Sequence, residues 1–237
     1  MCGRYTATNT LMELLARLGL KSTVDIVPRY NVAPTQPVLA VWEESGMREA
    51  RFARWGLMPR WVKDPRAFSL LVNARAETMI EKPAFRDSVK HGRCILPASG
   101  YYEWQTGPGN SKQPHYITFA NDEPMALAGL YSIWIGPNGE EVDTVATITV
   151  PANDQLRVVH DRMPAILRGE EIDRWLDVRG VGIAEATQLI LPLENGALKF
   201  HPVSTRVNSA RDDDEGLIAP VTIEKPRRPE PAQLDLF

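Results

Sequence analysis

Apolar residues follow two different periods along the chain, and the change between them divides it into regions. Leucines recur at helical spacing over residues 11–18, with Asn9 or Thr10 placed to cap the helix and Gly19 to stop it. From there to about residue 150, short runs rich in β-branched and aromatic residues indicate strands. We expect these strands at residues 38–43, 50–57, 93–96, 100–105, 115–120, 126–135 and 142–150.

Helical spacing returns after Pro151. It predicts helices over 152–159, 169–177 and 183–190, followed by a short strand at 198–203, and a further helical segment interrupts the strands near 76–90. From about Val221 the chain carries prolines among charged residues, a composition that cannot build a core. We therefore expect a globular part over residues 1–220 and a flexible tail over 221–237.

Composition narrows the class of protein. The chain has 237 residues, of which 43% are hydrophobic and 24% charged, as in ordinary globular proteins of one large or two small domains. Its two cysteines, Cys2 and Cys94, cannot form a disulfide framework or a four-cysteine zinc site, which favours a reducing compartment. No apolar run reaches the roughly 18 residues that a membrane-spanning helix needs, so we expect neither a membrane protein nor an exported one.

Charge is distributed unevenly. The whole chain has a formal charge of −3, but residues 48–93 hold eight Arg and three Lys against five acidic residues. Five aromatic residues lie in the same stretch, and cations interleaved with aromatics suit a surface that follows phosphates and stacks bases. The alternative, a solvated basic face over ordinary core aromatics, stays open.

Cys2 offers an unusual pair of reactive groups if Met1 is removed. An N-terminal cysteine carries an α-amine, with an ordinary pKa of about 7.7 to 8.0, beside a thiol on the neighbouring carbon. The amine can attack an aldehyde, and addition of the thiol to the resulting imine closes a thiazolidine ring. The alternative is that Cys2 is only part of a frayed terminus.

Two further residues can move protons. Glu103 is the single carboxylate in the aromatic and apolar strand expected at 100–105, where an unpaired charge would be costly. His160 precedes Asp161 and Arg162 at a proline-marked turn and could relay protons near neutral pH. A structural ion pair for Glu103 and a helix-capping role for His160 are equally compatible with the sequence.

The sequence lacks the motifs of several common catalytic and binding chemistries. The four histidines are dispersed and no HExxH or CxxC occurs, so we expect no metal. The phosphate-binding GxxxxGK[ST], the dinucleotide-binding GxGxxG after a strand and the serine-hydrolase GxSxG are also absent from the sequence. We therefore expect no cofactor.

A series of short segments occurs in the order found in one known family. They are Met-Cys-Gly-Arg-Tyr at 1–5, Arg-Tyr-Asn-Val-Ala-Pro-Thr-Gln at 29–36, Trp-Gly-Leu at 55–57 with Pro59 and Trp61, Asn-Ala-Arg-Ala-Glu-Thr at 73–78, Gly-Tyr-Tyr-Glu-Trp at 100–104, Lys-Gln-Pro at 112–114, His-Asp-Arg-Met-Pro at 160–164, and His-Pro-Val-Ser at 201–204 with Val207 and Asn208. On these segments the chain resembles the SRAP family, named for SOS-response-associated peptidase and regarded as sensors that shield abasic sites in DNA. The similarity extends from Met1 to about Pro220.

The resemblance implies a fold and a reaction. The fold would be a single α+β domain with a β-barrel-like core of mainly antiparallel strands, short helices around it and a positively charged groove for single-stranded DNA. Cys2 would capture the ring-opened aldehyde of an abasic site in that groove, and Asn73 would position the N-terminal residue and the sugar. Glu103 and His160 would form the proton-transfer pair.

The resemblance also implies DNA contacts. Arg4, Arg75 and Arg162 would bind the phosphates that flank the lesion, and Trp61 would supply a wedge or stacking surface. Related proteins often have a second consecutive aromatic where this chain has Val62. That departure bears on the stacking contacts and leaves the chemistry untouched.

The same resemblance places the protein in the DNA damage response during replication. It implies a covalent cross-link that protects the strand, a weak lyase side reaction at abasic sites and a proteolytic activity limited to removal of Met1. We expect a monomer without membrane association, located in the cytoplasm near the nucleoid and replication forks.

The last five residues form a separate motif that the family resemblance does not include. Gln233, Leu234, Asp235, Leu236 and Phe237 look like the peptide by which bacterial replication proteins dock on the sliding clamp. A tethered Leu-x-Phe can fill an apolar pocket, and a second weak contact gains from effective concentration. The alternative is that this apolar end packs back onto the domain.

Two other classes of protein stay open. N-terminal nucleophile amidohydrolases or amidotransferases also begin with Met-Cys-Gly and use the cysteine thiol to form a thioester. The Arg-rich aromatic stretch and the segment at 73–77 have no evident role in such a reaction. A noncovalent DNA-binding adaptor would form salt-sensitive complexes and would leave Cys2 without a task.

Overall fold

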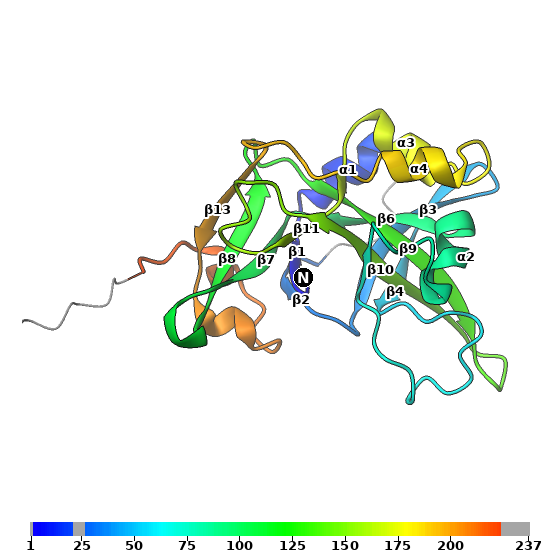
Figure 1. Ribbon diagram of the computed structural model, residues 1–237, viewed down its shortest axis with the longest axis horizontal. Coiled ribbons are helices and arrows are strands. Elements are labelled where there is room, and N and C mark those ends of the chain that lie inside the picture. Colours follow the sequence, from blue (N-terminus) through cyan, green and yellow to red (C-terminus); the bar gives the residue numbers. More distant parts are fainter. Residues whose placement is uncertain (1, 21–26, 224–237) are drawn as a thin grey trace, which may run out of the picture.

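A closed barrel of five strands forms one half of the molecule (Figure 1). The computed structural model describes residues 2–20 and 27–223. The barrel strands are β3 (Pro37–Glu44), β4 (Met47–Trp55), β6 (Arg93–Ala98), β9 (Met125–Ile135) and β10 (Glu141–Pro151). Their order β10-β4-β3-β6-β9 returns to its start because β9 also pairs with β10. The β4–β10 pairing is parallel and the other barrel pairings are antiparallel.

Three short strands extend the barrel sheet. They are β5 (Asn73–Arg75) and β11 (Arg162–Pro164), which pair with β10, and β12 (Ile166–Leu167), which pairs with β9. Pairing of β5 is parallel and sets Asn73 opposite Thr147. The C-terminal half of β10 therefore carries a strand on each side.

A second sheet of five strands lies beside the barrel, on the left in Figure 1. Its order is β13 (Leu198–Pro202), β8 (Lys112–Phe119), β7 (Gly100–Thr106), β1 (Tyr5–Ala7) and β2 (Arg29–Val32). The chain passes from barrel strand β6 into β7 across Ser99 alone. Gly100 permits this close transition, since a Cβ there would lie 2.5 Å from the Tyr116 hydroxyl.

In the described part of the chain, four short helices cover the barrel. They are α1 (Leu11–Arg17), α2 (Pro83–His91), α3 (Glu170–Leu176) and α4 (Ile183–Gln188). In Figure 1, α1, α3 and α4 lie together above the barrel, and α2 lies at its far side from β13. Each of α1, α2 and α3 buries one apolar stripe, such as Ile172 and Trp175 of α3. In the described residues, no helix combines the length and apolar character needed to cross a membrane.

Short 3-10 helices complete the chain: η1 (Pro108–Asn110), η2 (Thr205–Asn208) and η3 (Glu215–Ile218). The last two belong to a segment over residues 204–218 that follows β13. The α+β class, the barrel core and its mainly antiparallel pairing are confirmed. The longer expected strands and the helices near 11–18, 169–177 and 183–190 also appear, with small changes at their ends.

Two helical expectations were wrong in part. Residues 154–159 form consecutive turns instead of a helix, because only the amides of Arg157 and His160 make i→i+4 bonds and these are not consecutive. The Asn153 and Gln155 side chains instead donate to carbonyls of the segment 193–198. The helix expected near 76–90 begins only at Pro83, since a proline lacks an amide hydrogen and favours the first turn. Strands β1, β2, β5, β11 and β12 were missed because two to four residues cannot display an alternating pattern.

Candidate functional site

Pairing between β1 and β7 brings Cys2 to Glu103. Tyr5 of β1 stands opposite Tyr101 of β7 in an antiparallel register, so the residues before Tyr5 approach those after Tyr101. Cys2 and Glu103 are both buried, with exposed fractions of 0% and 2%. Burial raises the pKa of the Cys2 thiol well above its usual range, and the nearby Glu103 carboxylate raises it further. The thiol is therefore held as S–H at neutral pH.

Asn73 fixes the backbone of Cys2. Its side-chain Nδ2 donates a hydrogen bond of 2.9 Å to the Cys2 carbonyl oxygen. The buried Thr147 hydroxyl, opposite Asn73 in the β5–β10 pair, donates to Asn73 Oδ1. An amide that accepts on its oxygen must present its nitrogen elsewhere, so Thr147 directs Nδ2 to Cys2. Thr147 is a site residue that the sequence did not reveal.

Glu103 and His160 form a pair with shifted pKa values. Burial raises the pKa of Glu103 to about 7, and the Asp161 carboxylate adds to this shift. His160 Nε2 lies 4.0 Å from Glu103 Oε2, and burial lowers the pKa of the imidazole. A carboxyl with a pKa near neutrality can both give and take a proton under physiological conditions.

The hydrogen bonds of His160 indicate its tautomer. The Arg162 backbone amide donates to Nδ1 over 2.9 Å, which places the ring proton on Nε2, facing Glu103. Asp161 Oδ1 is also 2.9 Å from Nδ1 and would favour a proton there. We assign the Nε2 proton because the amide has a fixed position, whereas the Asp161 side chain is 84% exposed and competes with water.

Four residues expected to carry the chemistry therefore come together where the barrel meets the second sheet. Asn73 contacts Cys2, Cys2 lies near Glu103, and Glu103 faces His160. They come from β5, the segment before β1, β7 and the turn before β11. Within residues 2–20 and 27–223, no three His, Cys, Asp or Glu side chains gather in a way that could hold a metal ion.

Comparison with known proteins assigns this arrangement to a family. A family model described as SOS response associated peptidase (SRAP) matches residues 1–210. This chain belongs to the SRAP family. The matched range contains every residue of the site and both sheets, so the SRAP resemblance seen in the sequence is confirmed.

Named SRAP relatives align over most of this chain. The abasic site processing protein YoqW of Bacillus subtilis is 34% identical over 221 residues, covering 92% of this chain and 99% of its own. The abasic site processing protein HMCES of Gallus gallus is 36% identical over 232 residues, covering 84% of this chain and 68% of its own. A crystal structure of a protein from Bacteroides thetaiotaomicron superposes with a TM-score of 0.83 at 28% identity, covering 93% of this chain and all of that one.

Arg4, expected at DNA phosphates in this SRAP chain, forms hydrogen bonds with one side chain and two backbone carbonyls of the same chain. Its Nη1 donates 2.7 Å hydrogen bonds to Asn31 Oδ1 and the Val207 carbonyl, and Nη2 donates to the Asn208 carbonyl over 3.2 Å. The guanidinium thus ties the N-terminal segment to η2.

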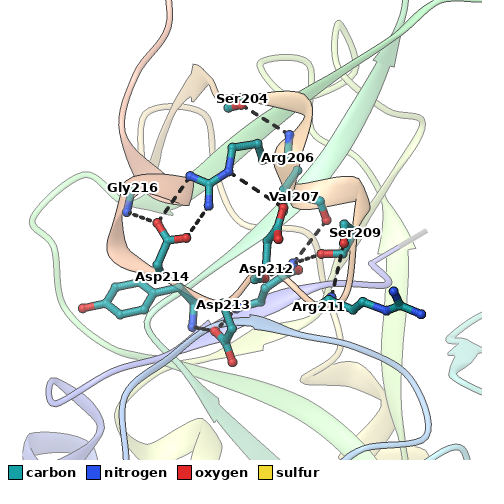
Figure 2. Close-up of polar contacts among 11 residues, drawn as sticks. Ser204, Arg206, Val207, Ser209, Arg211, Asp212, Asp213, Asp214 and Gly216 are labelled. Carbon is teal, nitrogen blue, oxygen red and sulfur yellow. Dashed lines mark hydrogen bonds and ion pairs between the residues drawn. The ribbon is translucent and has the colours of Figure 1, made fainter.

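The segment over residues 204–218 that receives Arg4 is itself held by ion pairs and amide contacts. Figure 2 shows Arg206 against Asp214, whose carboxylate also accepts from the Gly216 amide over 3.0 Å. Asp213 accepts from the backbone amide of Asn31 over 2.9 Å and so fastens the segment to β2. The support of Arg4 is therefore built from residues far away in the sequence.

Of the other expected DNA contacts, Arg75 and Arg162 lie on strands that pair with β10, and Trp61 lies in the loop between β4 and β5. Arg162 is paired with Glu77, with Nη1 and Nη2 at 2.5 and 3.0 Å from the two carboxylate oxygens, and Nη2 also donates to the Thr149 carbonyl over 2.6 Å. Arg75 of β5 is exposed. Trp61 is 58% exposed and packs edge-on against Phe68, with ring centroids 5.5 Å apart.

Proposed function

We propose that this protein captures abasic sites in single-stranded DNA as a covalent cross-link to Cys2, and so protects the strand in the DNA damage response. The observation that carries the proposal is the fixed position of Cys2, with its carbonyl held by Asn73 and its thiol beside Glu103. Relatives named as abasic site processing proteins support the choice of substrate.

The reaction begins with the N-terminal amine that removal of Met1 exposes. The amine nitrogen adds to the carbonyl carbon of the ring-opened deoxyribose, and a proton passes from nitrogen to oxygen to give a carbinolamine. Loss of water gives an imine. The Cys2 sulfur then bonds to the imine carbon while the thiol proton passes to nitrogen, which closes a thiazolidine. The sum is aldehyde plus aminothiol to thiazolidine plus water, without oxidant or reductant.

Glu103 and His160 suit the proton transfers in these steps. A carboxyl with a pKa of about 7 is present in both forms at neutral pH, so its acid form can protonate the departing hydroxyl and its base form can accept the thiol proton. His160, neutral and protonated on Nε2, can donate toward Glu103 as charge changes there. The pair can therefore shuttle one proton between the reacting groups.

The shifted pKa of Cys2 separates this reaction from that of an N-terminal nucleophile amidohydrolase. Thiol nucleophiles that attack amides are activated by a lowered pKa, because the thiolate is the reacting form. Burial acts in the opposite direction at Cys2. In aldehyde capture the amine attacks first, and the thiol adds to an already electrophilic imine.

Two side activities follow from the same groups. Hydrolysis of the Met1–Cys2 peptide bond, in which water supplies the hydroxyl of the released methionine, would expose the amine and account for a peptidase limited to its own terminus. An imine at the sugar also acidifies the C2′ hydrogen, and its loss would expel the 3′-phosphate as a weak lyase reaction. Only the thiazolidine stops that elimination.

Recruitment to the sliding clamp is a further part of the proposal. Its motif, residues 233–237, lies outside the residues that the structure describes. Its support is the sequence alone: a Leu-x-Phe peptide at the end of a proline-rich, charged stretch. Deletion of these five residues should abolish co-elution with a bacterial clamp, and unchanged co-elution would contradict it.

The covalent proposal is tested by denaturing gel electrophoresis. Full-length protein, with loss of Met1 verified by mass spectrometry, is mixed with single-stranded DNA that carries one abasic site or an intact base. We expect a heat-stable shifted band with the abasic strand only. Cys2→Ala should form no stable band, because it lacks the thiol that closes the ring.

Cys94→Ala is the matched control. Cys94 is the other cysteine, buried in β6 of the barrel, and its thiol has no part in the reaction. It should cross-link as wild type does. Equal cross-linking by Cys2→Ala and wild type would refute the mechanism, and glutamine turnover by wild type but not Cys2→Ala would favour the amidohydrolase instead.

A further inference from the structure

A hollow beside α2 has an unusual surface. It measures about 780 Å³ and is lined by Trp61, Ile80 and α2 residues that include Arg86, Lys90 and His91. We call these five residues the α2 surface. Trp61 and Ile80 are 58% and 40% exposed, although a buried position would stabilise both. An exposed aromatic and an exposed aliphatic side chain across one hollow can hold a flat ring between them.

The cations of this region lack carboxylate partners, unlike several other arginines of the same basic stretch. Arg48, Arg51 and Arg66 each form an ion pair. Across residues 2–20 and 27–223, by contrast, no carboxylate lies within ion-pair distance of Arg86 or Lys90. The same holds for the neighbouring Arg60 and Lys82, and all four are exposed.

One acidic side chain also faces the hollow. It is Asp87, which lies on α2 between the two cations. The C-terminal end of the helix, where Lys90 lies, does not itself attract anions. Binding of an anion here would therefore depend on the side-chain cations, and its strength should fall steeply with salt.

The α2 surface continues from the candidate site. Asn73 and Arg75 belong to β5, and the next residues turn back at once, since the amides of Thr78 and Met79 both donate to the Arg75 carbonyl. Ile80 follows directly, and α2 begins at Pro83. A strand that leaves the site past Arg75 could therefore follow this segment to Ile80, which lines the hollow together with Trp61 and the α2 cations.

From this continuity we propose that the α2 surface binds nucleotides of the same DNA single strand beyond the abasic site. The stacking role of Trp61 is the one that the family resemblance already implies. What the α2 surface adds is contact of a base with Ile80 and binding of phosphates by Arg86 and Lys90. The occupant is a polynucleotide because the surface pairs an aromatic platform with unneutralised cations, the combination that single strands require. This inference rests on the proposed function and adds a second binding region to it.

The test measures equilibrium binding without the covalent step. Fluorescence anisotropy follows single-stranded oligonucleotides that carry a tetrahydrofuran abasic analogue, which has no aldehyde. One oligonucleotide ends close to the analogue, and others extend by about six nucleotides on the 5′ or the 3′ side, within the usual footprint of a single-strand site. In a further set of oligonucleotides, a complementary strand makes each extension double-stranded.

Arg86→Gln/Lys90→Gln should bind one of the two extended strands about 10-fold more weakly than wild type, and its salt dependence should fall by about 1.4 in logarithmic slope. Trp61→Ala should show a loss of about 10-fold on the same strand. The matched control, Arg168→Gln/Lys199→Gln, removes the same charge from residues that are ion-paired elsewhere. It should lower affinity for all strands only slightly.

Equal losses in the control, or no dependence on either extension, would overturn the proposal. A loss confined to double-stranded extensions would replace the single strand by a duplex as occupant. Because the analogue cannot cross-link, these outcomes are independent of the denaturing gel. Failure of covalent capture and failure of the α2 surface can therefore be told apart.

Discussion

Thr147 donates its hydroxyl hydrogen to Asn73, and this hydrogen bond sets the direction in which Asn73 holds Cys2. The three residues come from β10, β5 and the segment before β1, so the barrel positions the reactive terminus of the second sheet. Without the Thr147 hydroxyl, the Asn73 side-chain oxygen would lose its donor, and the amide would be held less firmly against the Cys2 carbonyl.

Removal of that hydroxyl should slow cross-linking. Thr147→Val keeps the shape but loses the donor, and a lost buried hydrogen bond of about 1–2 kcal/mol corresponds to a rate lower by roughly 10-fold. The measurement is the single-turnover rate of the denaturing-gel band. Thr147→Ser keeps the hydroxyl and should stay close to wild type. Equal cross-linking rates for Thr147→Val and Thr147→Ser would show that Asn73 does not need the hydrogen bond from the Thr147 hydroxyl.

Glu103 should make stability depend on pH between about 4.5 and 7. Burial raises its pKa from the ordinary 4.5 to about 7, so the folded state binds the proton more tightly than the unfolded state. Its contribution is complete below pH 4.5 and is lost as the pH rises through 7. In a His160→Gln background, the unfolding free energy should fall across this window by up to about 3 kcal/mol more with Glu103 than with Glu103→Gln.

Urea denaturation at pH values below, within and above this window measures the difference. The His160→Gln background removes the imidazole, whose lowered pKa has the opposite effect: its stabilising contribution is lost as the pH falls. Parallel stability curves for the two proteins would mean that Glu103 has an ordinary pKa.

Glu77 should compete with DNA for Arg162. The two side chains form a bidentate ion pair, which lowers the pKa of Glu77. Glu77→Gln removes the negative charge and leaves the guanidinium available to a phosphate, so affinity for a single strand with the tetrahydrofuran analogue should rise by about 3-fold to 5-fold at low salt. Anisotropy titration checks this. Glu81→Gln, which removes an exposed carboxylate nearby, is the control, and an equal gain there would contradict the competition.

Loss of the hydroxyl should change the stability of the fold differently at two adjacent tyrosines. The Tyr101 hydroxyl is buried and has no hydrogen-bond partner among the described residues, whereas the Tyr102 hydroxyl donates to the Tyr30 carbonyl over 2.7 Å. Tyr101→Phe should therefore leave stability unchanged or slightly raised, and Tyr102→Phe should cost about 1 kcal/mol. Thermal unfolding of the two variants side by side decides, and equal losses would mean that the Tyr101 hydroxyl is stabilised after all.

The candidate residues of the site were easier to pick out from the sequence than the residues that support them. Cys2, Glu103 and His160 attract notice because their side chains are reactive or costly to bury. Thr147 does not, because it lies in the run Thr-Ile-Thr-Val, where every residue also suits a strand. Its role appears only when β5 pairs with β10.

Long-range partners explain what else the sequence concealed. Arg4 was expected at DNA phosphates, and its contacts with the carbonyls of Val207 and Asn208 cross about two hundred positions, with 203 between Arg4 and Val207. Helical spacing over residues 152–159 was also misleading, since Asn153 and Gln155 bind the distant segment 193–198 and the helical bonds are not consecutive. Spacing reports local preference, and in these places tertiary contacts decided the structure.

The tie between Arg4 and η2 has a consequence for how the protein is made. During synthesis the first residues leave the ribosome long before Val207 and Asn208 exist, so the N-terminal segment must wait for the carbonyls that fix Arg4. The order of translation therefore delays assembly of the reactive end until nearly the whole chain has emerged. A nascent chain exposes its cysteine early but acquires the geometry that the proposed capture requires only late.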